Sequence, residues 1–398
     1  MTTKKITGEI YYFGAQDNDL KLFESLWKIP DGISYNCYLI NDEKTALIDT
    51  VEKRFNQELL ENIKTILKDK HLDYLVINHM EPDHSGTIKE IQATYPKVTI
   101  VGNHKTAGFA QGFYDIPENQ IKEVKTGDSL QLGKHQLKFH QTPMLHWPES
   151  MVSYEEKTKT LFSSDLFGGF KTVGDEPFAD DRNDLTEYID QARQYFATVL
   201  GAYTRPAKKA LNMLSNLEID CVAPAHGLMW QKNSKKIIDL YQQWSELKGK
   251  PGVVIIVGSM YGFTREMAQL IKNQLETKKI PAKTMNAAQT TLGEQLAEVW
   301  QSQGVIIGSC TYNNGLFPPI KYLINALKER KIQNRYLGIF GSYSWTGGAM
   351  RFLEEFAGNS KLNLVEPQFE TQYKLDEQSK KEAIKLAENM ANKINSSN

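Results

Sequence analysis

The sequence predicts an α/β protein built from two successive units, and three observations support this. The chain of 398 residues exceeds the length of one ordinary domain, which is about 100–200 residues. Its first half alternates short apolar runs with turn-forming residues, and its second half alternates apolar runs with amphipathic helical segments. A Gly/Pro/Lys stretch at residues 248–252 separates the halves, so we expect domains at residues 1–250 and 251–398.

The first half contains the signals of packed α/β layers. Between two of its apolar runs, residues 55–67 carry apolar side chains at helical spacing, which predicts strand, helix, strand. Further strands are expected after Gly133, and helices return near residues 185–217. The runs that we interpret as strands are residues 11–13, 37–40, 46–48, 74–77, 98–101 and 137–139.

The second half shows regular alternation of strands and helices. A polar amphipathic helix, with Ser234 as its N-cap, precedes the boundary, and another begins near Arg265. Apolar runs with no polar positions indicate strands buried on both faces of a parallel sheet, so a doubly wound sheet is expected. These runs are residues 253–257, 305–307 and 337–340, with a short strand near 283–285.

Composition excludes several classes of function. The chain has 47 Lys+Arg and 48 Asp+Glu, a formal charge of −1, and no dense basic run, so nucleic acid is not an expected partner. No segment approaches the roughly 18 apolar residues of a membrane span, and no leader is apparent. Cys37, Cys221 and Cys310 are too few and too far apart for a disulfide framework or a four-thiolate iron centre. We therefore expect a cytoplasmic protein whose electron-carrying partners are separate chains.

A dense group of metal-binding side chains follows the strand expected at residues 74–77. The segment reads His79-Met80-Glu81-Pro82-Asp83-His84-Ser85-Gly86. If it is extended, residues 79, 81 and 83 project to one side, and a turn at Ser85-Gly86 brings His84 round. His146, Asp165 and His226 each follow a strand or turn later in the chain. Any one of these three alone is more often a packed side chain or a helix cap.

The order of these seven residues is more informative than any one of them. The series H-x-E-x-D-H, then His, Asp and His, resembles the metal-ligand signature of the metallo-β-lactamase superfamily, in its flavodiiron branch. The resemblance implies an αββα sandwich in which His79, Glu81 and His146 hold one iron, Asp83, His84 and His226 hold the other, and Asp165 bridges them. The other histidines, which we interpret as surface residues, are His71, His104, His135 and His140.

Glu81 distinguishes this series from that of the zinc hydrolases in the same superfamily. Those enzymes typically carry histidine at its position, and an imidazole-rich set suits zinc. A carboxylate there, together with Asp83 and Asp165, gives a harder and more anionic set that can neutralise two iron ions.

The second half carries a predicted flavin site in three loops. Ser259-Met260-Tyr261-Gly262-Phe263-Thr264 lies between a strand and a helix, where free backbone N–H groups bind phosphate. It resembles the flavodoxin phosphate loop but has Tyr261 where threonine is usual. Two more loops follow later strands, and ligands of such sheets bind at the carboxyl ends of strands. From these loops the predicted contacts are Ser309, Thr311, Tyr312, Asn313, Asn314, Gly315, Ser342, Tyr343, Ser344, Trp345 and Gly347.

The expected flavin is FMN, because no G-x-G-x-x-G opens the first strand-to-helix turn for FAD or NAD. Both groups of motifs occur in the domain order of the flavodiiron family and cover almost the whole chain. That resemblance implies a flavodoxin-like second domain and reduction of O2 to water, NO to N2O, or both. It also implies an electron donor such as rubredoxin or a rubredoxin/NADH reductase, and a head-to-tail homodimer or a dimer of dimers. Between the two gases we favour O2.

Two other functions stay open at the level of sequence. One is a zinc-dependent hydrolase with an appended flavodoxin-like redox module, which Glu81 disfavours. The other is a flavodoxin-like electron carrier whose first domain is a metal-free scaffold, which requires the seven-residue series to be accidental.

Overall fold

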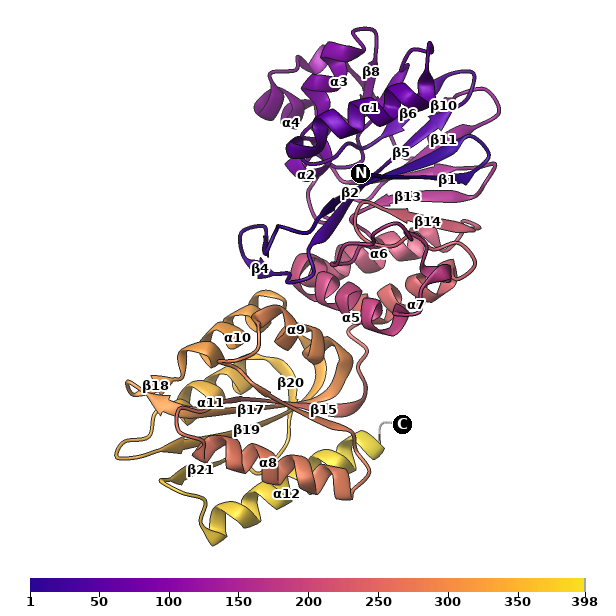
Figure 1. Ribbon diagram of the computed structural model, residues 1–398. Helices are drawn as coiled ribbons and strands as arrows, with labels where there is room; N and C mark the ends of the chain where they lie inside the picture. Colours follow the sequence, from indigo (N-terminus) through magenta and orange to yellow (C-terminus); the bar gives the residue numbers. More distant parts are fainter. Residues whose placement is uncertain (397–398) are drawn as a thin grey trace. The chain divides into compact units, whose positions relative to one another are not determined.

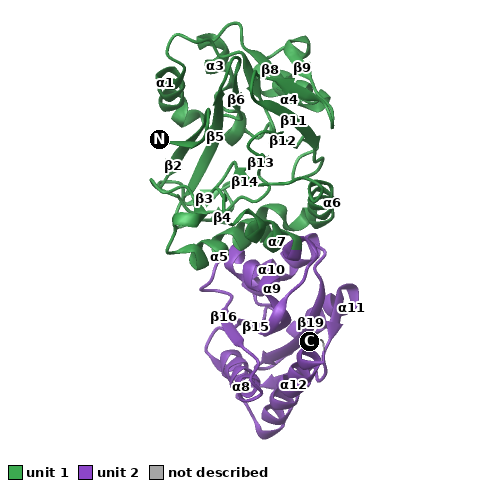
Figure 2. Cartoon of the chain, turned by 90° about the vertical axis from the view of Figure 1, so that its right-hand side faces the viewer, with its two compact units in different colours: residues 1–242 green, residues 243–398 purple. Residues whose placement is uncertain are grey.

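The computed structural model describes residues 1–396, and these fold as two compact units, one of residues 1–242 and one that begins at Gln243 (Figure 2). The predicted domain limits, 1–250 and 251–398, stay a prediction. No helix within the described part of the chain is both long and apolar enough to cross a membrane.

The first unit contains two sheets that pack through an apolar core. The seven-stranded sheet has the order β1-β2-β5-β6-β7-β8-β9, and the five-stranded sheet has the order β10-β11-β12-β13-β14. Side chains of both sheets, among them Tyr12, Val76, Phe139 and Phe162, form one buried cluster. The first sheet comprises β1 (Thr2–Thr7), β2 (Ile10–Asp17), β5 (Ile33–Asn41), β6 (Thr45–Ile48), β7 (Tyr74–Val76), β8 (Thr99–Gly102) and β9 (Ile121–Glu123). The second comprises β10 (Ser129–Gln131), β11 (Gln136–Gln141), β12 (Met151–Glu155), β13 (Thr160–Ser164) and β14 (Cys221–Pro224).

Helices lie outside both sheets, which completes the αββα sandwich (Figure 1). A small hairpin of β3 (Leu22–Phe23) and β4 (Trp27–Lys28) stands apart from the sheets. On the side of the first sheet lie α1 (Asn56–Leu67), α3 (Ile88–Thr94) and α4 (His104–Tyr114). On the side of the second lie α5 (Leu185–Tyr195), α6 (Thr204–Leu214) and α7 (Ser234–Ser245).

The second unit is a doubly wound parallel sheet with the order β16-β15-β17-β19-β20. This order, with the first strand second from the edge, is that of flavodoxin-like folds, so the predicted fold class is confirmed. The strands are β15 (Lys250–Gly258), β16 (Ala282–Asn286), β17 (Ser302–Tyr312), β19 (Gln333–Tyr343) and β20 (Lys361–Leu364), with β18 (Gly315–Leu316) beside β17 and β21 (Phe369–Gln372) beside β19. The helices are α8 (Phe263–Thr277), α9 (Leu292–Gln301), α10 (Pro318–Glu329), α11 (Ala349–Asn359) and α12 (Glu377–Asn395).

Arg335 ties the segment before β15 to the base of this sheet. Its guanidinium is 1% exposed and donates to the carbonyl oxygens of Leu247, Val299 at 3.0 Å and Trp300 at 2.9 Å. Burial lowers the pKa of Arg335 to about 10. The Trp300 indole N–H donates to the carbonyl of Trp244 at 3.3 Å. Residues 243–249 therefore belong structurally to the second unit.

A fragment of residues 243–398 should consequently be more stable than one of residues 251–398. The shorter fragment removes the Leu247 carbonyl from Arg335 and the Trp244 carbonyl from Trp300, and the loss of a buried hydrogen-bond acceptor costs about 1–3 kcal/mol. Urea unfolding of the two fragments, both loaded with FMN, measures the difference. If both fragments unfold with the same urea midpoint and the same slope, residues 243–249 contribute nothing to the stability of the second unit.

Candidate metal centre and flavin site

The first metal-binding segment leaves β7 as an extended chain and then turns into a short helix, α2 (Pro82–Ser85). Pro82 occupies the start of this helix, where its missing N–H and fixed φ favour helix initiation. The expected extended conformation is therefore found for Glu81, at φ −58° and ψ 139°, and is wrong for Asp83, which lies in the helix. The helical turn, and not a bend at Ser85-Gly86, brings Asp83 and His84 to the site.

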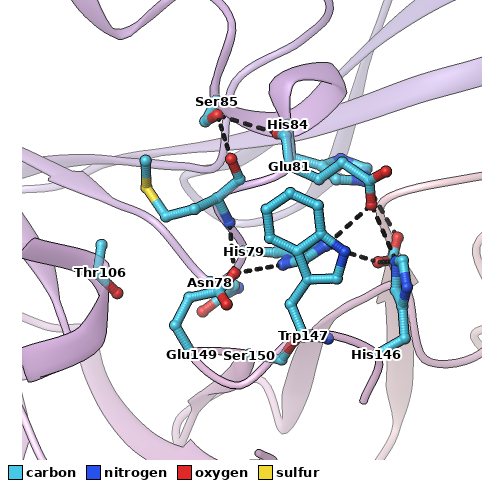
Figure 3. Close-up of polar contacts among 12 residues, drawn as sticks. Asn78, His79, Glu81, His84, Ser85, Thr106, His146, Trp147, Glu149 and Ser150 are labelled. Atoms are coloured by element: carbon cyan, nitrogen blue, oxygen red, sulfur yellow. Dashed lines mark hydrogen bonds and ion pairs between the residues drawn. The ribbon is translucent and has the colours of Figure 1, made fainter. Parts of the chain in front are cut away.

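The other three residues reach the same place from the second sheet. His146 lies in the loop between β11 and β12, Asp165 comes directly after β13, and His226 lies just beyond β14. Figure 3 shows His146 facing Glu81 and His79 across this site. The structure thus brings all seven predicted residues together.

The seven side chains form two groups that share one carboxylate. Donor atoms of His79, Glu81, His146 and Asp165 lie within 4.8 Å of one another, as do those of Asp83, His84 and His226. Asp165 Oδ2 is 3.3 Å from Nε2 of both His79 and His146. Asp165 Oδ1 is 3.1 Å from His84 Nε2 and 3.5 Å from His226 Nε2. Each oxygen of Asp165 therefore faces a different group.

Several of these atoms are buried without hydrogen bonds, which tests whether a metal fits. Both carboxylate oxygens of Asp83 and Asp165, and Nε2 of His84 and His226, have no hydrogen-bond partner. Buried polar atoms in proteins normally have one. Oxygen and imidazole donors that converge without partners are what a pair of divalent or trivalent cations requires, so the residues fit a dinuclear metal centre.

Electrostatics within the site favour a positive charge at its centre. Burial alone would lower the pKa of His79, but the charge of Asp165 and hydrogen bonds to Glu149 and Glu81 raise it to about 10. Burial also acts to lower the pKa values of His146 and His84, but neighbouring carboxylates outweigh it. They raise the pKa of His146 to about 10 and that of His84 to about 9. The raised pKa values couple metal binding to proton release, because an imidazole nitrogen must be deprotonated to bind a metal.

Sequence reasoning missed two buried residues at this site. Tyr195 is 0% exposed, its hydroxyl has no hydrogen-bond partner, and its ring lies 5.6 Å from that of His226. Burial and the charge of Asp165 raise its pKa well above the usual value, so the hydroxyl stays a proton donor. Glu149, also 0% exposed, accepts a hydrogen bond from His79 Nδ1 at 2.7 Å. In the sequence, the only feature that marks Glu149 is its position three residues after His146.

The surface interpretation of the remaining histidines is wrong for two of them. His135 is 0% exposed and lies 3.0 Å from carboxylate oxygens of both Glu9 and Glu155. His140, on β11, is 9% exposed, and burial lowers its pKa. His71 is half-buried and His104 is exposed. None of the four belongs to the two metal-binding groups.

The predicted phosphate loop lies between β15 and α8. Gly262, at φ +105°, is the residue before the helix, and its N–H donates to Ser259 Oγ at 3.1 Å. The Thr264 side chain is 1% exposed, and its hydroxyl lies 2.8 Å from that of Ser342 at the end of β19. These hydroxyls and the free N–H groups of α8 gather at the carboxyl ends of two strands, as phosphate binding requires. Around them, Met260, Tyr261 and Phe263 are 45–87% exposed.

The second predicted loop is a tight hairpin between β17 and β18. Asn313 and Asn314 have φ of +47° and +56°, and Tyr312 pairs with Gly315. Consecutive left-handed residues define a two-residue turn that asparagine tolerates. Ser309 Oγ accepts from Phe317 N–H at 3.1 Å, and Thr311 Oγ1 accepts from Ala349 N–H at 3.2 Å, so both hydroxyls also brace the loops.

The third loop follows β19 and borders a cavity of about 680 Å³. Trp345 is 85% exposed, and Gln372 donates to the Ser344 carbonyl at 2.9 Å. Four of the predicted flavin contacts line this cavity: Asn314, Tyr343, Trp345 and Gly347. Open aromatic side chains beside a polar cavity suit a flat ring with one hydrogen-bonding edge.

Comparisons with known proteins agree with both sites. Residues 33–227 match the ODP family beta lactamase, and residues 255–386 match the flavodoxin family. The anaerobic nitric oxide reductase flavorubredoxin of Pectobacterium carotovorum is 34% identical over 351 residues, 87% of this chain and 69% of the relative. The chain belongs to the flavodiiron protein family. Its cofactors are accordingly FMN and a diiron centre, as predicted.

Solved structures of the family share the whole fold. Rubredoxin oxygen:oxidoreductase from Desulfovibrio gigas is 27% identical with a TM-score of 0.93 and covers 99% of each chain. A flavo di-iron protein variant from Thermotoga maritima is 28% identical with a TM-score of 0.89 and covers 98% of each chain. A zinc hydrolase is therefore not favoured for this flavodiiron protein.

Proposed function

We propose that the protein reduces O2 to water, NO to N2O, or both, at a diiron centre that receives electrons through FMN from a separate donor. The position of Asp165 carries this proposal. Its two oxygens face two groups of metal-binding side chains, one with a glutamate and two histidines, the other with an aspartate and two histidines. The assigned ligands are His79, Glu81, Asp83, His84, His146, Asp165 and His226.

The metal ligands and the side chains around them have different roles in gas reduction. Two bound irons would hold the small gas and supply it with electrons. Tyr195 presents a neutral hydroxyl beside Asp165 and can donate a hydrogen bond there. Phe23, whose ring lies 5.5 Å from that of His226, and Phe170 beside Tyr195 keep the surroundings apolar. An apolar pocket admits an uncharged gas more readily than water.

The names of the relatives support both gases. The flavorubredoxins are called nitric oxide reductases, and the Desulfovibrio gigas protein is called a rubredoxin oxygen:oxidoreductase. Steady-state consumption of O2 and of NO with one electron donor measures the preference, for which we expect O2. Metal analysis with a visible spectrum tests the function itself. Iron with flavin supports it, whereas zinc with flavin or flavin alone contradicts it.

The donor is expected to be a protein such as rubredoxin with its reductase, or a rubredoxin/NADH reductase. Pure enzyme should therefore oxidise NADH slowly or not at all, because no nicotinamide fingerprint accompanies the flavin loops. The measurement is NADH absorbance under air, before and after addition of a rubredoxin and its reductase. Fast NADH consumption by the enzyme alone would contradict a separate donor.

A head-to-tail homodimer, or a dimer of two such dimers, fits the surfaces around both sites. In the second unit, exposed apolar side chains surround the flavin loops: Met260, Tyr261, Phe263, Tyr312 and Trp345. In the first unit, exposed apolar side chains occur on the β3–β4 hairpin, in the His146 loop and on α4: Leu22, Leu26, Met144 and Phe113. Pairing unlike sites across a two-fold axis would cover both surfaces and bring the FMN of one chain to the irons of the other.

A further inference from the structure

A buried carboxylate lies directly behind the His79 ring. Glu149 is 0% exposed, and its Oε1 lies 2.7 Å from His79 Nδ1 and accepts from the Met80 N–H at 3.0 Å (Figure 3). Both contacts to this oxygen come from nitrogen atoms, so the carboxylate oxygen is the acceptor in each. Asn103, which caps α4, donates its side-chain amide to the Glu149 carbonyl and so fixes the backbone.

This contact determines which nitrogen of His79 is available for metal. When Nδ1 carries the hydrogen that Glu149 accepts, Nε2 keeps its lone pair. Nε2 is the atom that faces Glu81 at 3.2 Å and Asp165 at 3.3 Å. Trp147 packs against the same ring edge to face, at 5.2 Å and 89°, which restricts its rotation.

Glu149 also brings an additional negative charge close to the metal-binding groups. Its Oε2 is buried without a hydrogen-bond partner. Within residues 1–396, His79 is the one side chain that forms an ion pair with it. The charge is therefore not neutralised by a lysine or arginine, and a low-dielectric interior transmits it effectively to nearby cations.

We propose that Glu149 is a positioning residue of the metal centre, which orients His79 for metal binding and favours the ferric over the ferrous state by its charge. This inference rests on the proposed diiron function. Partners behind metal-bound histidines typically change metal affinity by about 10–100-fold when they are removed. A negative charge stabilises Fe³⁺ more than Fe²⁺, so its loss should raise the reduction potential of the centre.

Two variants separate orientation from charge. Glu149→Gln keeps an oxygen that can accept from His79 and Met80 but removes the charge. Glu149→Ala removes both. Glu155→Gln is a matched control, because Glu155 is also 0% exposed and lies 3.0 Å from a buried histidine, His135, outside the metal-binding groups. Thermal unfolding of all variants checks that the fold is retained.

The experiment uses full-length protein loaded with iron and FMN. Chelator competition gives the iron dissociation constant, and a redox titration followed by electron paramagnetic resonance gives the midpoint potential of the diiron centre. For Glu149→Ala we expect about 10–100-fold weaker iron binding. For Glu149→Gln we expect smaller changes in affinity but a roughly tenfold shift of the one-electron equilibrium towards Fe²⁺, a rise of about 59 mV.

Glu155→Gln should match the wild type in both quantities. If Glu149→Gln and Glu149→Ala also match it, Glu149 has neither role and the inference is refuted, while the diiron function stands. If wild-type protein takes up zinc in active form and no iron, the proposed function fails first and the inference fails with it.

Discussion

Replacement of Asp165 by alanine is expected to abolish gas reduction while FMN stays bound. Asp165 supplies an oxygen to each metal-binding group, so its loss leaves both groups one donor short and removes the bridge between them. Iron content should fall well below that of wild type. Turnover should drop by more than about a thousandfold, which corresponds to roughly 4 kcal/mol of activation free energy.

The measurements are iron per chain, the flavin absorption spectrum, and O2 or NO consumption with one donor. Asp220→Ala is a suitable control, because Asp220 is an exposed aspartate of the same unit whose nearest ion pair, to Lys159, is 4.0 Å long. Such surface pairs contribute about 0–1 kcal/mol, so this variant should keep iron and activity. Full iron content and activity in Asp165→Ala would contradict the bridging assignment.

The positions of the loops that carry the metal and flavin sites could be expected from the sequence because the signals for them are local. His79 and Glu81 directly follow a strand, and the buried run at residues 253–257 precedes a hydroxyl-containing turn. A strand's end fixes where the next side chains lie, so the sequence indicates which loops meet at one edge of a sheet. The full set of seven metal-binding residues came from the resemblance to the flavodiiron signature. The short helix α2 was not anticipated, although Pro82 is a helix-start signal, because four residues are too few to show periodicity.

Contacts between distant segments could not be predicted in this way. His135 lies beside Glu9, in the turn between β1 and β2, and Glu155, on β12. Neither partner is close to His135 in the sequence, so no local pattern predicts the contact. From the sequence, Tyr195 is interpreted as one more apolar residue of a helix. Only the folded structure shows that it lies beside His226. From the sequence, Glu149 is one more carboxylate in a loop. The structure shows that it contacts His79. Burial of polar groups is a property of the assembled layers.

Electron transfer between chains gives the second large expected effect. We expect that mixing two inactive variants will restore activity. Asp165→Ala should lack a functional diiron centre. Thr264→Asp should lack FMN, because it places a carboxylate at the predicted phosphate site, where Thr264 is 1% exposed and contacts Ser342. In a head-to-tail hybrid, the intact FMN of the first chain faces the intact irons of the second.

Hybrids are made by dissociation and reassembly, and two affinity tags isolate them from the parent dimers. One of the two sites in each hybrid is complete, so its turnover should be about half that of a wild-type dimer. The matched control pairs a wild-type chain with a chain that carries both substitutions. If electrons pass between chains, that hybrid has no complete site and should be inactive.

The two hybrids therefore give opposite results under the two routes of electron transfer. Transfer between chains makes the hybrid of single variants active and the control hybrid inactive. Transfer within a chain reverses both results, because the control hybrid contains one chain with its own FMN and irons intact. Circular dichroism of each variant must match the wild type, since Thr264 is buried and an unfolded second unit would also be inactive. An active control hybrid beside an inactive hybrid of single variants would refute the head-to-tail arrangement, whatever the oligomeric state.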